Sequence, residues 1–339
     1  SHRKQEKQQC LNMEYIIIND YRDTKAFTGK TFSGFKKTQV IKELVESILY
    51  NKIEDACYWC FELLFAGHYI DLWETIFHIM SVHIHCGNPK LPIYISVRSN
   101  EFKQIINQHT QYQELDFRNN KNIRHIFLEI MIILCYSDKK HEITYVKLND
   151  DALNISELGR LLMATSTNYC KPFFRFQDPK EIYIPVNEFA YHISRDSCIF
   201  HKATYWVEWL FHFDTMCKKR KTPVFCETRN YIDNPKLSND IIWILWDSIL
   251  NESKQRDDSI MDKIIRSLLS LFCLRMSQVT KKKRRHLFYF AILLLCDCKT
   301  TNINITDCDD IQSIVKKTTS LLQKIKQNEI HVNPEEQLK

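Results

Sequence analysis

The sequence predicts a mainly α-helical fold in two lobes, joined by a more irregular region with a small β element. Apolar residues recur at helical spacing through most of the 339-residue chain. Glycine occurs only five times, whereas doubly wound and phosphate-cradling folds need glycine for tight turns and close backbone approach. A short pattern also occurs twice, which is the mark of an internal repeat.

The repeated pattern consists of two matched blocks in each half. Ala56–Trp59 begins a helix-like stretch that reaches Asn88–Leu91, and 147 residues later Ala203–Trp206 begins one that reaches Asn234–Leu237. The intervals from Ala to Asn are 32 and 31 residues. The residues between the blocks align poorly, so chance similarity stays open beside an internal duplication.

The first lobe is predicted over residues 31–136. It follows an N-terminal arm, 1–30, in which Tyr15–Ile18 forms a possible short strand. Thr38 is expected to cap a helix ending near Tyr50, and Gly67 to end the next helix. The helices predicted after the first one are Asn51–Ala66, Ile70–His85, Pro92–Asn107 and Asn122–Tyr136.

A connecting region is predicted over 137–195, where prolines interrupt helical periodicity. Ile143–Leu148 and Glu181–Ile184 combine β-branched and aromatic residues and are predicted to be extended, with one helix near 155–165. The second lobe, 196–327, precedes a polar tail, 328–339. Its predicted helices are 200–218, 239–251, 258–275, 284–297 and 309–326.

The composition favours a globular protein of a reducing compartment. The chain is 44% hydrophobic and 26% charged. Its longest apolar run, Leu287–Cys296, is too short for a membrane span of about 20 residues, so no membrane insertion is expected. Thirteen cysteines form no even framework, several lie in apolar helical runs, and no signal peptide is evident, so reduced thiols and no secretion are expected.

No catalytic, cofactor-binding or metal-binding residues are predicted. Thr28–Thr31 resembles the end of a phosphate-binding loop, but Thr24 stands where that loop needs its first glycine. A zinc site is the other candidate, and it lacks a converging second pair of ligands. Its residues would be Cys57, Cys60, His83, His85 and Cys86. An active site assembled from scattered residues stays open.

The net charge of +6 includes two basic runs in the second half. Each is a candidate contact for nucleic acid or another acidic partner, and a solvated surface is the alternative. The second run would oppose the dipole of a helix beginning at 284, which an acidic partner would relieve. The candidate residues are Lys218, Lys219, Arg220, Lys221, Lys281, Lys282, Lys283, Arg284 and Arg285.

Tryptophans pair at i, i+3 spacing on two predicted helices. Trp206 pairs with Trp209, and Trp243 pairs with Trp246. Such aromatics serve as core residues or as anchors of protein interfaces, and less often as platforms for unpaired bases. Trp209, Trp243 and Trp246 are the candidate interface anchors.

Several segments of the chain together carry a resemblance to a known family. They are Ser33–Lys37, Asp55–Trp59, Ala66–His68, Leu72–Trp73, Gly87–Pro89, Ala203–Trp209, Asp240–Trp243 and Lys283–Arg285. These segments resemble a family of largely uncharacterised proteins from giant, nucleocytoplasmic large DNA viruses. The resemblance covers most of 30–298 and implies no known activity. The first block is also similar, more weakly, to the helical C-terminal tetramerisation domain of a clamp-loader-clade AAA+ ATPase, although the ATPase module is absent.

Two functions are therefore predicted. The first is a non-enzymatic assembly protein of a large DNA virus, such as a minor capsid or inner virion component. It would act in the virion or in the cytoplasm of the infected cell, with other viral proteins or further copies of itself as partners. The alternative is a replication or repair accessory derived from a clamp-loader collar, binding DNA through its basic second half. The small net charge favours the first function.

Overall fold

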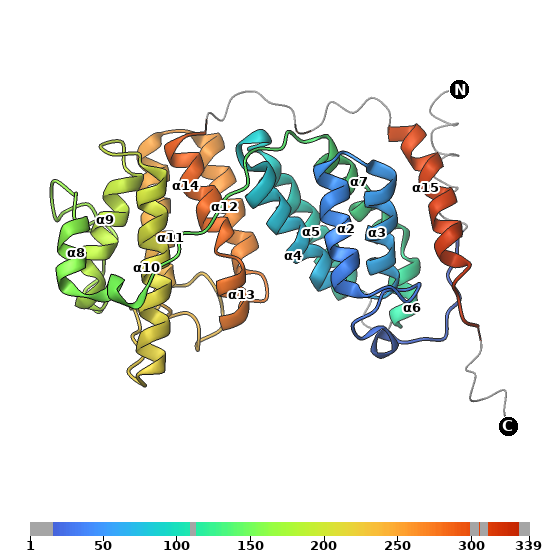
Figure 1. Ribbon diagram of the computed structural model, residues 1–339, viewed down its shortest axis with the longest axis horizontal. Coiled ribbons are helices and arrows are strands. Elements are labelled where there is room, and N and C mark those ends of the chain that lie inside the picture. Colours follow the sequence, from blue (N-terminus) through green and yellow to red (C-terminus); the bar gives the residue numbers. More distant parts are fainter. Residues whose placement is uncertain (1–15, 109–112, 299–304, 306–310, 332–339) are drawn as a thin grey trace. The chain divides into compact units, whose positions relative to one another are not determined.

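The computed structural model describes residues 16–108, 113–298, 305 and 311–331, and this part of the chain is all-helical (Figure 1). Helix makes up 65% of the structure. In place of a sheet, the described residues form two isolated antiparallel bridges, Lys30 with Lys36 and Phe225 with Asp240. The predicted helical class is confirmed, and the small β element is not found in the described residues.

The chain divides into two compact units. Unit 1 comprises Ser1–Met80, Val97–Lys139 and Asn304–Lys339, and unit 2 comprises Ser81–Ser96 and Lys140–Ile303. The predicted lobes follow the order of the chain, whereas these units alternate along it. The last helix, predicted with the second lobe, belongs to unit 1.

Unit 1 is organised around α3, Ile53–Phe65, which packs against four other helices. Phe61 and Leu64 are fully buried on α3, as are Leu322 and Ile325 on the last helix. Gly67 ends α3 with a φ of 74°, as predicted, because a left-handed residue there favours glycine. The other helices of unit 1 are η2 Thr24–Phe27, α2 Lys37–Leu49, α4 Tyr69–Ile79, α6 Glu114–Asn119, α7 Lys121–Tyr136 and α15 Ile311–Lys326.

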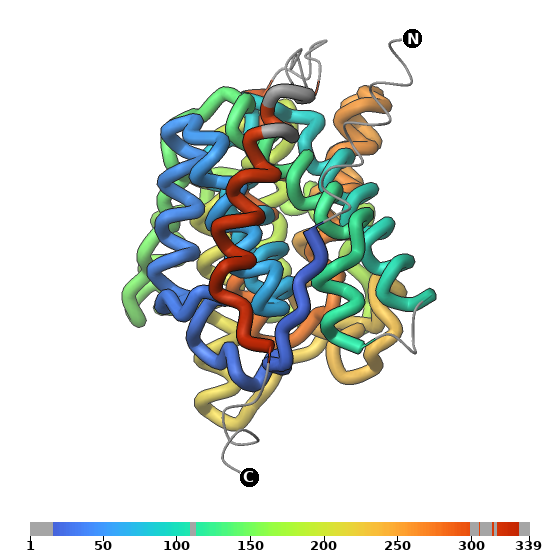
Figure 2. Tube along the Cα trace, turned by 90° about the vertical axis from the view of Figure 1, so that its right-hand side faces the viewer, coloured from blue at the N-terminus to red at the C-terminus, as the bar shows by residue number. Residues whose placement is uncertain are grey.

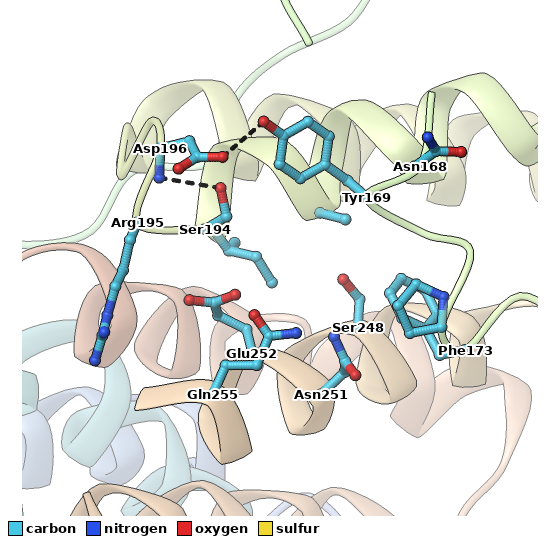
Figure 3. A pocket seen from close by; sticks show the side chains of 13 residues that line it. Asn168, Tyr169, Phe173, Ser194, Arg195, Asp196, Ser248, Asn251, Glu252 and Gln255 are labelled. Atoms are coloured by element: carbon cyan, nitrogen blue, oxygen red, sulfur yellow. Dashed lines mark hydrogen bonds between the residues drawn. The ribbon is translucent and has the colours of Figure 1, made fainter. Parts of the chain in front are cut away.

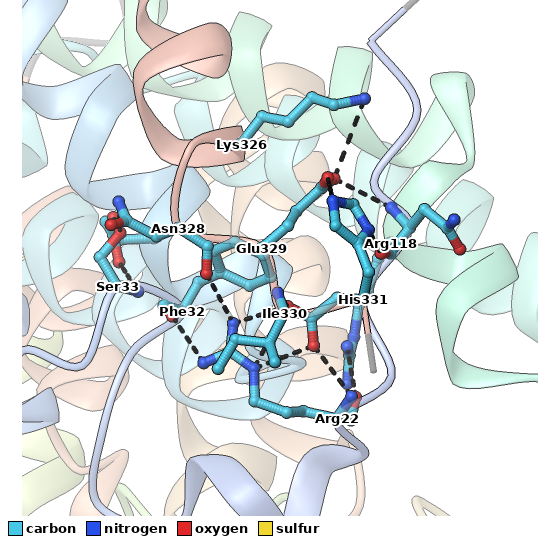
Figure 4. Close-up of polar contacts among 12 residues, drawn as sticks. Arg22, Phe32, Ser33, Arg118, Lys326, Asn328, Glu329, Ile330 and His331 are labelled. Atoms are coloured by element: carbon cyan, nitrogen blue, oxygen red, sulfur yellow. Dashed lines mark hydrogen bonds and ion pairs between the residues drawn. The ribbon is translucent and has the colours of Figure 1, made fainter. Parts of the chain in front are cut away.

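The segment after α15 binds the start of the described chain. Figure 2 shows α15 alongside the N-terminal segment, and Figure 4 shows the contacts. The amide of Tyr21 donates to the carbonyl of Ile330 at 3.0 Å, and the amide of Ile330 donates to Asp20. The amide of Asn19 donates to Glu329 at 2.9 Å. Residues about 310 positions apart are thereby joined.

Buried arginines complete the core of unit 1. Arg124 donates to the carbonyls of Ile16 and Arg118, at 2.7 and 2.8 Å, and to Asn119 Oδ1 at 2.8 Å. Its guanidinium lies 4.8 Å from the centre of the Phe65 ring. The short strand predicted at Tyr15–Ile18 is therefore replaced, over 16–18, by an irregular segment whose polar groups bind side chains of α6 and α7.

Unit 2 contains the remaining helices. Its first residues continue α4 as a π-helical turn, η3 Met80–Ile84, so the predicted helix Ile70–His85 is interrupted at its end. Residues 91–96 of α5, Leu91–Gln108, belong to unit 2 and its remainder to unit 1. The other helices of unit 2 are η4 His85–Gly87, η5 Asp150–Leu153, α8 Ile155–Leu161, η6 Lys180–Ile182, α9 Tyr183–Ile193, α10 Phe200–Lys219, α11 Ile242–Arg256, α12 Ser259–Cys273, α13 Gln278–Lys283 and α14 His286–Cys296.

The extended segments predicted in the connecting region are wrong. Glu181–Ile184 is helical, divided between η6 and the start of α9, and Pro185 is the third residue of α9. Proline fits the first helical turn because the amides there have no intrahelical acceptor. Ile143–Leu148 has no regular structure, and the amide of Ile143 donates to the carbonyl of Val82 at 3.1 Å.

Candidate nucleic-acid interface at the basic end of unit 2

The structure brings the two basic runs of unit 2 together. The first run ends α10 and the second forms the end of α13, at the same end of unit 2 (Figure 1). Lys218 Nζ lies 2.8 Å from Asp214 Oδ2 and donates to Gln278 at 3.0 Å. One lysine thus joins the last turn of α10 to the first residue of α13, 60 positions away.

A buried ion cluster holds this junction. Lys281 is 1% exposed, and its Nζ lies 2.8 Å from Asp214 and 2.7 Å from Asp240. Burial alone would lower the pKa of Lys281, but Asp240 and Asp214 outweigh it and raise the pKa. Burial would raise the pKa of Asp214, and Lys281 and Lys218 lower it instead. Lys281 therefore stabilises the packing of α13 and is closed to a partner.

Two further cations of the second run are also engaged within unit 2. Arg284 is buried and donates to the carbonyls of Leu271 and Phe272, which end α12, and to that of Leu274. Arg285 lies 3.3 Å from Glu208, and its guanidinium lies 4.1 Å from the centre of the Tyr145 ring. The prediction that Lys281 and Arg284 contact an acidic partner is corrected, because burial among acceptors assigns both to the core.

Six cations of the two runs face solvent, and five of them have no ion pair within the part of the chain that the structure describes. The sixth, Lys218, pairs with Asp214. The five unpaired residues, here called the basic end, are Lys219, Arg220, Lys221, Lys282 and Lys283. The cations of both runs lie in or just after the last turns of α10 and α13, where positive charge is favourable to the helix dipole. The helix predicted to begin at 284 begins at His286 as α14, with Arg285 as its N-cap, and the preceding part of the run forms the last turn of α13, where positive charge is favourable.

The predicted tryptophan anchors lie in the core of unit 2. Trp243 and Trp246 are fully buried, and Trp246 packs against Phe288 with ring centres 4.5 Å apart. Trp209 is also buried, and its indole N–H donates to the carbonyl of Ala152 at 3.0 Å. None of the three is accessible to a partner, which corrects the prediction of interface anchors. Their apolar neighbours on each helix explain the burial.

One group of side chains in unit 2 has the composition of a catalytic triad. Ser197 Oγ lies 2.9 Å from His192 Nδ1, and His192 Nε2 lies 3.6 Å from Glu188. Glu188 instead accepts hydrogen bonds from the amides of Met163 and Ala164, at 2.9 and 3.0 Å. His192 is fully buried, and 3.6 Å exceeds a hydrogen bond. Through Glu188 the group therefore fixes the 163–164 loop against α9.

The cysteines and histidines considered for zinc are divided between the units. Cys57 and Cys60 are buried in α3 of unit 1, where burial raises both thiol pKa values, whereas His83 and His85 belong to unit 2. Among the described residues, no three His, Cys, Asp or Glu side chains are placed to hold a metal ion. All the described cysteines are free thiols. No helix within the described ranges is long and apolar enough to cross a membrane.

Comparison of the chain with protein families, curated proteins and solved structures finds no match.

Proposed function

We propose that this protein is a non-enzymatic nucleic-acid-binding protein that contacts phosphates through the basic end of unit 2. The observation that carries the proposal is the joining of two distant basic runs over the buried Lys281 cluster. The Lys281 ion cluster holds α10 and α13 together, so that five exposed cations lie at one end of unit 2. Such a group of cations suits a phosphate backbone better than scattered charge does. Contacts of this kind position the chain without reading base sequence.

Of the two functions predicted from the sequence, the proposal favours the second, a replication or repair accessory of a large DNA virus. Burial of the three tryptophans removes the anchors that favoured an assembly role. The resemblance of 30–298 to proteins of large DNA viruses supports action in an infected cell. The weaker similarity to a clamp-loader collar supports a role beside DNA.

The test neutralises the basic end by changing Lys219, Arg220, Lys221, Lys282 and Lys283 to Gln. Each contacted phosphate contributes about −0.9 to the slope of log affinity against log salt, so five contacts give a slope of about −4.5 with duplex DNA. The quintuple variant should bind with a slope close to zero. Fluorescence anisotropy with a labelled duplex over a range of salt concentrations measures both slopes.

A matched control neutralises five exposed lysines of unit 1, which lowers the net charge equally. It should keep most of the wild-type slope. Equal loss of slope in both variants would show that net charge alone drives binding and would refute the proposed interface. The control changes Lys25, Lys30, Lys42, Lys52 and Lys103 to Gln.

A virion assembly role is the second candidate, and the surface of α8 favours it. Ile155, the first residue of α8, is 87% exposed, and Leu161, Leu162 and Met163 are exposed at the end of α8 and just after it. Exposed apolar side chains on a surface are typical of protein interfaces. A partner with an apolar face, such as another viral protein, would cover them. Mass spectrometry of purified virions tests this role, and loss of packaging in an Ile155→Asp, Leu162→Asp variant would support it.

We also propose that the matched blocks are copies of one ancestral unit in two helical lobes. Ala56 and Ala203 are each the fourth residue of their helix and are fully buried. The amides of Leu91 and Leu237 donate to the carbonyls of Asn88 and Asn234, at 3.1 and 3.0 Å. Between the blocks the halves differ, since α10 is one long helix where α3 and α4 are two. Superposition of experimentally determined halves tests the duplication.

A further inference from the structure

A polar groove follows α11 in unit 2, away from the residues of the basic end. Two adjoining pockets of about 370 and 480 Å³ form it, and they share Pro172, Phe173 and Asn251. Each pocket has the size of a small-molecule site, roughly 300–1,000 Å³. We call the first the amide pocket and the second the basic pocket.

The amide pocket combines aromatic rings with hydrogen-bonding groups. Tyr169 lies across the pocket from α11, near Asp196, and Phe173 lies near Ser248 (Figure 3). Four pocket residues come from one face of α11. Their spacing of i, i+3, i+4 and i+7 places them in one row along the helix. The α11 residues are Ser248, Asn251, Glu252 and Gln255.

Ser248 gives the strongest sign that this pocket holds a ligand. It is 1% exposed, and its hydroxyl has no hydrogen-bond partner among the described residues. Figure 3 shows the hydroxyl directed into the pocket. Buried hydroxyls are nearly always hydrogen-bonded, because a lost bond to water must be replaced. A polar ligand atom in the pocket would supply the missing partner.

Further polar groups in the pocket match the edge of a nucleobase. Glu252 is buried and lies 2.7 Å from Arg256 Nε. Its carboxylate can accept a further hydrogen bond, which suits an amino group of a ligand. The side-chain amides of Asn251 and Gln255 form no hydrogen bond within the described chain, and each offers a donor beside an acceptor. Amides of this kind bind nucleobases in pairs of hydrogen bonds, and aromatic rings stack on the bases.

The basic pocket adjoins this site and suits an anion. Arg175, Lys254 and Arg266 line it, and Lys254 is exposed. The carboxylate in the pocket, Asp247, is already compensated, because Arg229 donates to it at 2.8 Å and the Tyr231 hydroxyl at 2.5 Å. Arg175 pairs with Glu227 at 3.4 Å and Arg266 with Asp262 at 2.6 Å, so Lys254 is the cation of this pocket that has no ion pair among the described residues and is available to a ligand.

We propose that the α11 groove binds a nucleoside phosphate, with its base in the amide pocket and its phosphates in the basic pocket. Asn251 lies at the junction because it lines both pockets. A base with an attached phosphate occurs both in a free nucleotide and at the phosphorylated end of a single-stranded nucleic acid. The site does not depend on nucleic-acid binding at the basic end.

Calorimetric titration of the quintuple glutamine variant tests this site without phosphate binding at the basic end. The ligands are ATP, adenosine and inorganic triphosphate. ATP should bind at least about tenfold more tightly than either fragment, since it alone fills both pockets. Lys254→Gln should weaken ATP by about tenfold and leave adenosine unchanged. Ser248→Ala should weaken both, and it removes an unpaired polar group, so folding is retained.

The matched control is Lys263→Gln, an exposed lysine on α12 that lines neither pocket. It should leave every affinity unchanged. Comparing the affinities of ATP and a short 5′-phosphorylated oligonucleotide shows whether the ligand is a free nucleotide or the end of a strand. Tighter binding of either one supports the site. Absence of saturable binding, or triphosphate binding as tightly as ATP, would overturn the proposal.

Discussion

Arg124 of unit 1 and Arg229 of unit 2 are both buried, but different kinds of acceptor stabilise them. In unit 1, Arg124 donates to three oxygens, none of which belongs to a carboxylate. In unit 2, Arg229 donates to the carboxylates of Asp178 and Asp247. Burial lowers the pKa of Arg124 to about 10, whereas the two aspartates outweigh burial and raise the pKa of Arg229.

The difference decides what remains when the cation is removed. Loss of an arginine held by carbonyls leaves neutral dipoles, each of which loses one hydrogen bond. Loss of a cation held by carboxylates leaves buried negative charge, which is much more unfavourable. The two arginines should therefore respond unequally to the same substitution, and only the loss of Arg229 should have an effect that depends on acid.

The largest effect is expected for Arg229→Met. Asp178 is fully buried and would lose its cation, so the free energy of unfolding should fall by about 3–5 kcal/mol. Urea denaturation followed by tryptophan fluorescence measures the change. Adding Asp178→Asn should restore part of it, because the remaining charge is removed.

The control for this variant is Arg175→Met. Arg175 is exposed and makes a 3.4 Å ion pair with Glu227, so its loss should change stability by less than about 1 kcal/mol. If Arg229→Met were no more destabilising than this control, the contrast between the units would fail.

Helices were predictable where apolar residues recur regularly. The predicted ranges 122–136 and 200–218 differ from α7 and α10 by one residue at one end. The local sequence pattern does not predict the structure where a contact with a distant part of the chain determines it. The packing of α15 on α3 joins the two ends of the chain, and nothing near 311–326 indicates that partner. The start of α9 was mistaken for a strand because β-branched and aromatic residues there outweighed the evidence of an early proline.

The candidate site was predictable in part for the same reason. Six of the nine basic residues face solvent, as a charged run normally does. The burial of Lys281 depends on Asp214 and Asp240, which lie 67 and 41 positions away, so the run itself carries no sign of it. The α11 groove was missed because its residues come from separate segments. The i, i+3, i+4, i+7 row of polar residues from Ser248 was the available signal.

The second-largest effect is expected for Lys281→Met, which should lower the free energy of unfolding by about 2–4 kcal/mol near neutral pH. Lys218 still pairs with Asp214, which limits the loss. The pKa of Lys281 is raised from 10.5, so its stabilisation is present below that value and lost at higher pH. The pKa of Asp214 is lowered from 3.8, so its stabilisation is present above that value and lost as pH falls. The difference from wild type should therefore shrink below about pH 4.

Denaturation at a series of pH values measures this difference, with Lys282→Met as the exposed neighbour. That control should stay within about 0.5 kcal/mol of wild type throughout. A Lys281 effect that persists unchanged in acid would show that packing, and not the ion cluster, accounts for the loss.

The smallest effect is expected for Arg124→Met, at about 1–3 kcal/mol. The variant leaves two carbonyls and one amide oxygen without their donor, and it removes a cation from the face of Phe65. None of these groups titrates below pH 9, and the lowered pKa of Arg124 is about 10. A folded pKa below the usual value means that burial disfavours the charged form, and this penalty is relieved only as Arg124 loses its proton above about pH 10. The difference from wild type should therefore be flat between about pH 4 and 9, in contrast to Lys281→Met. The same series of pH values measures the difference in free energy of unfolding between Arg124→Met and wild type. If this difference disappeared in acid, Arg124 would also depend on a carboxylate.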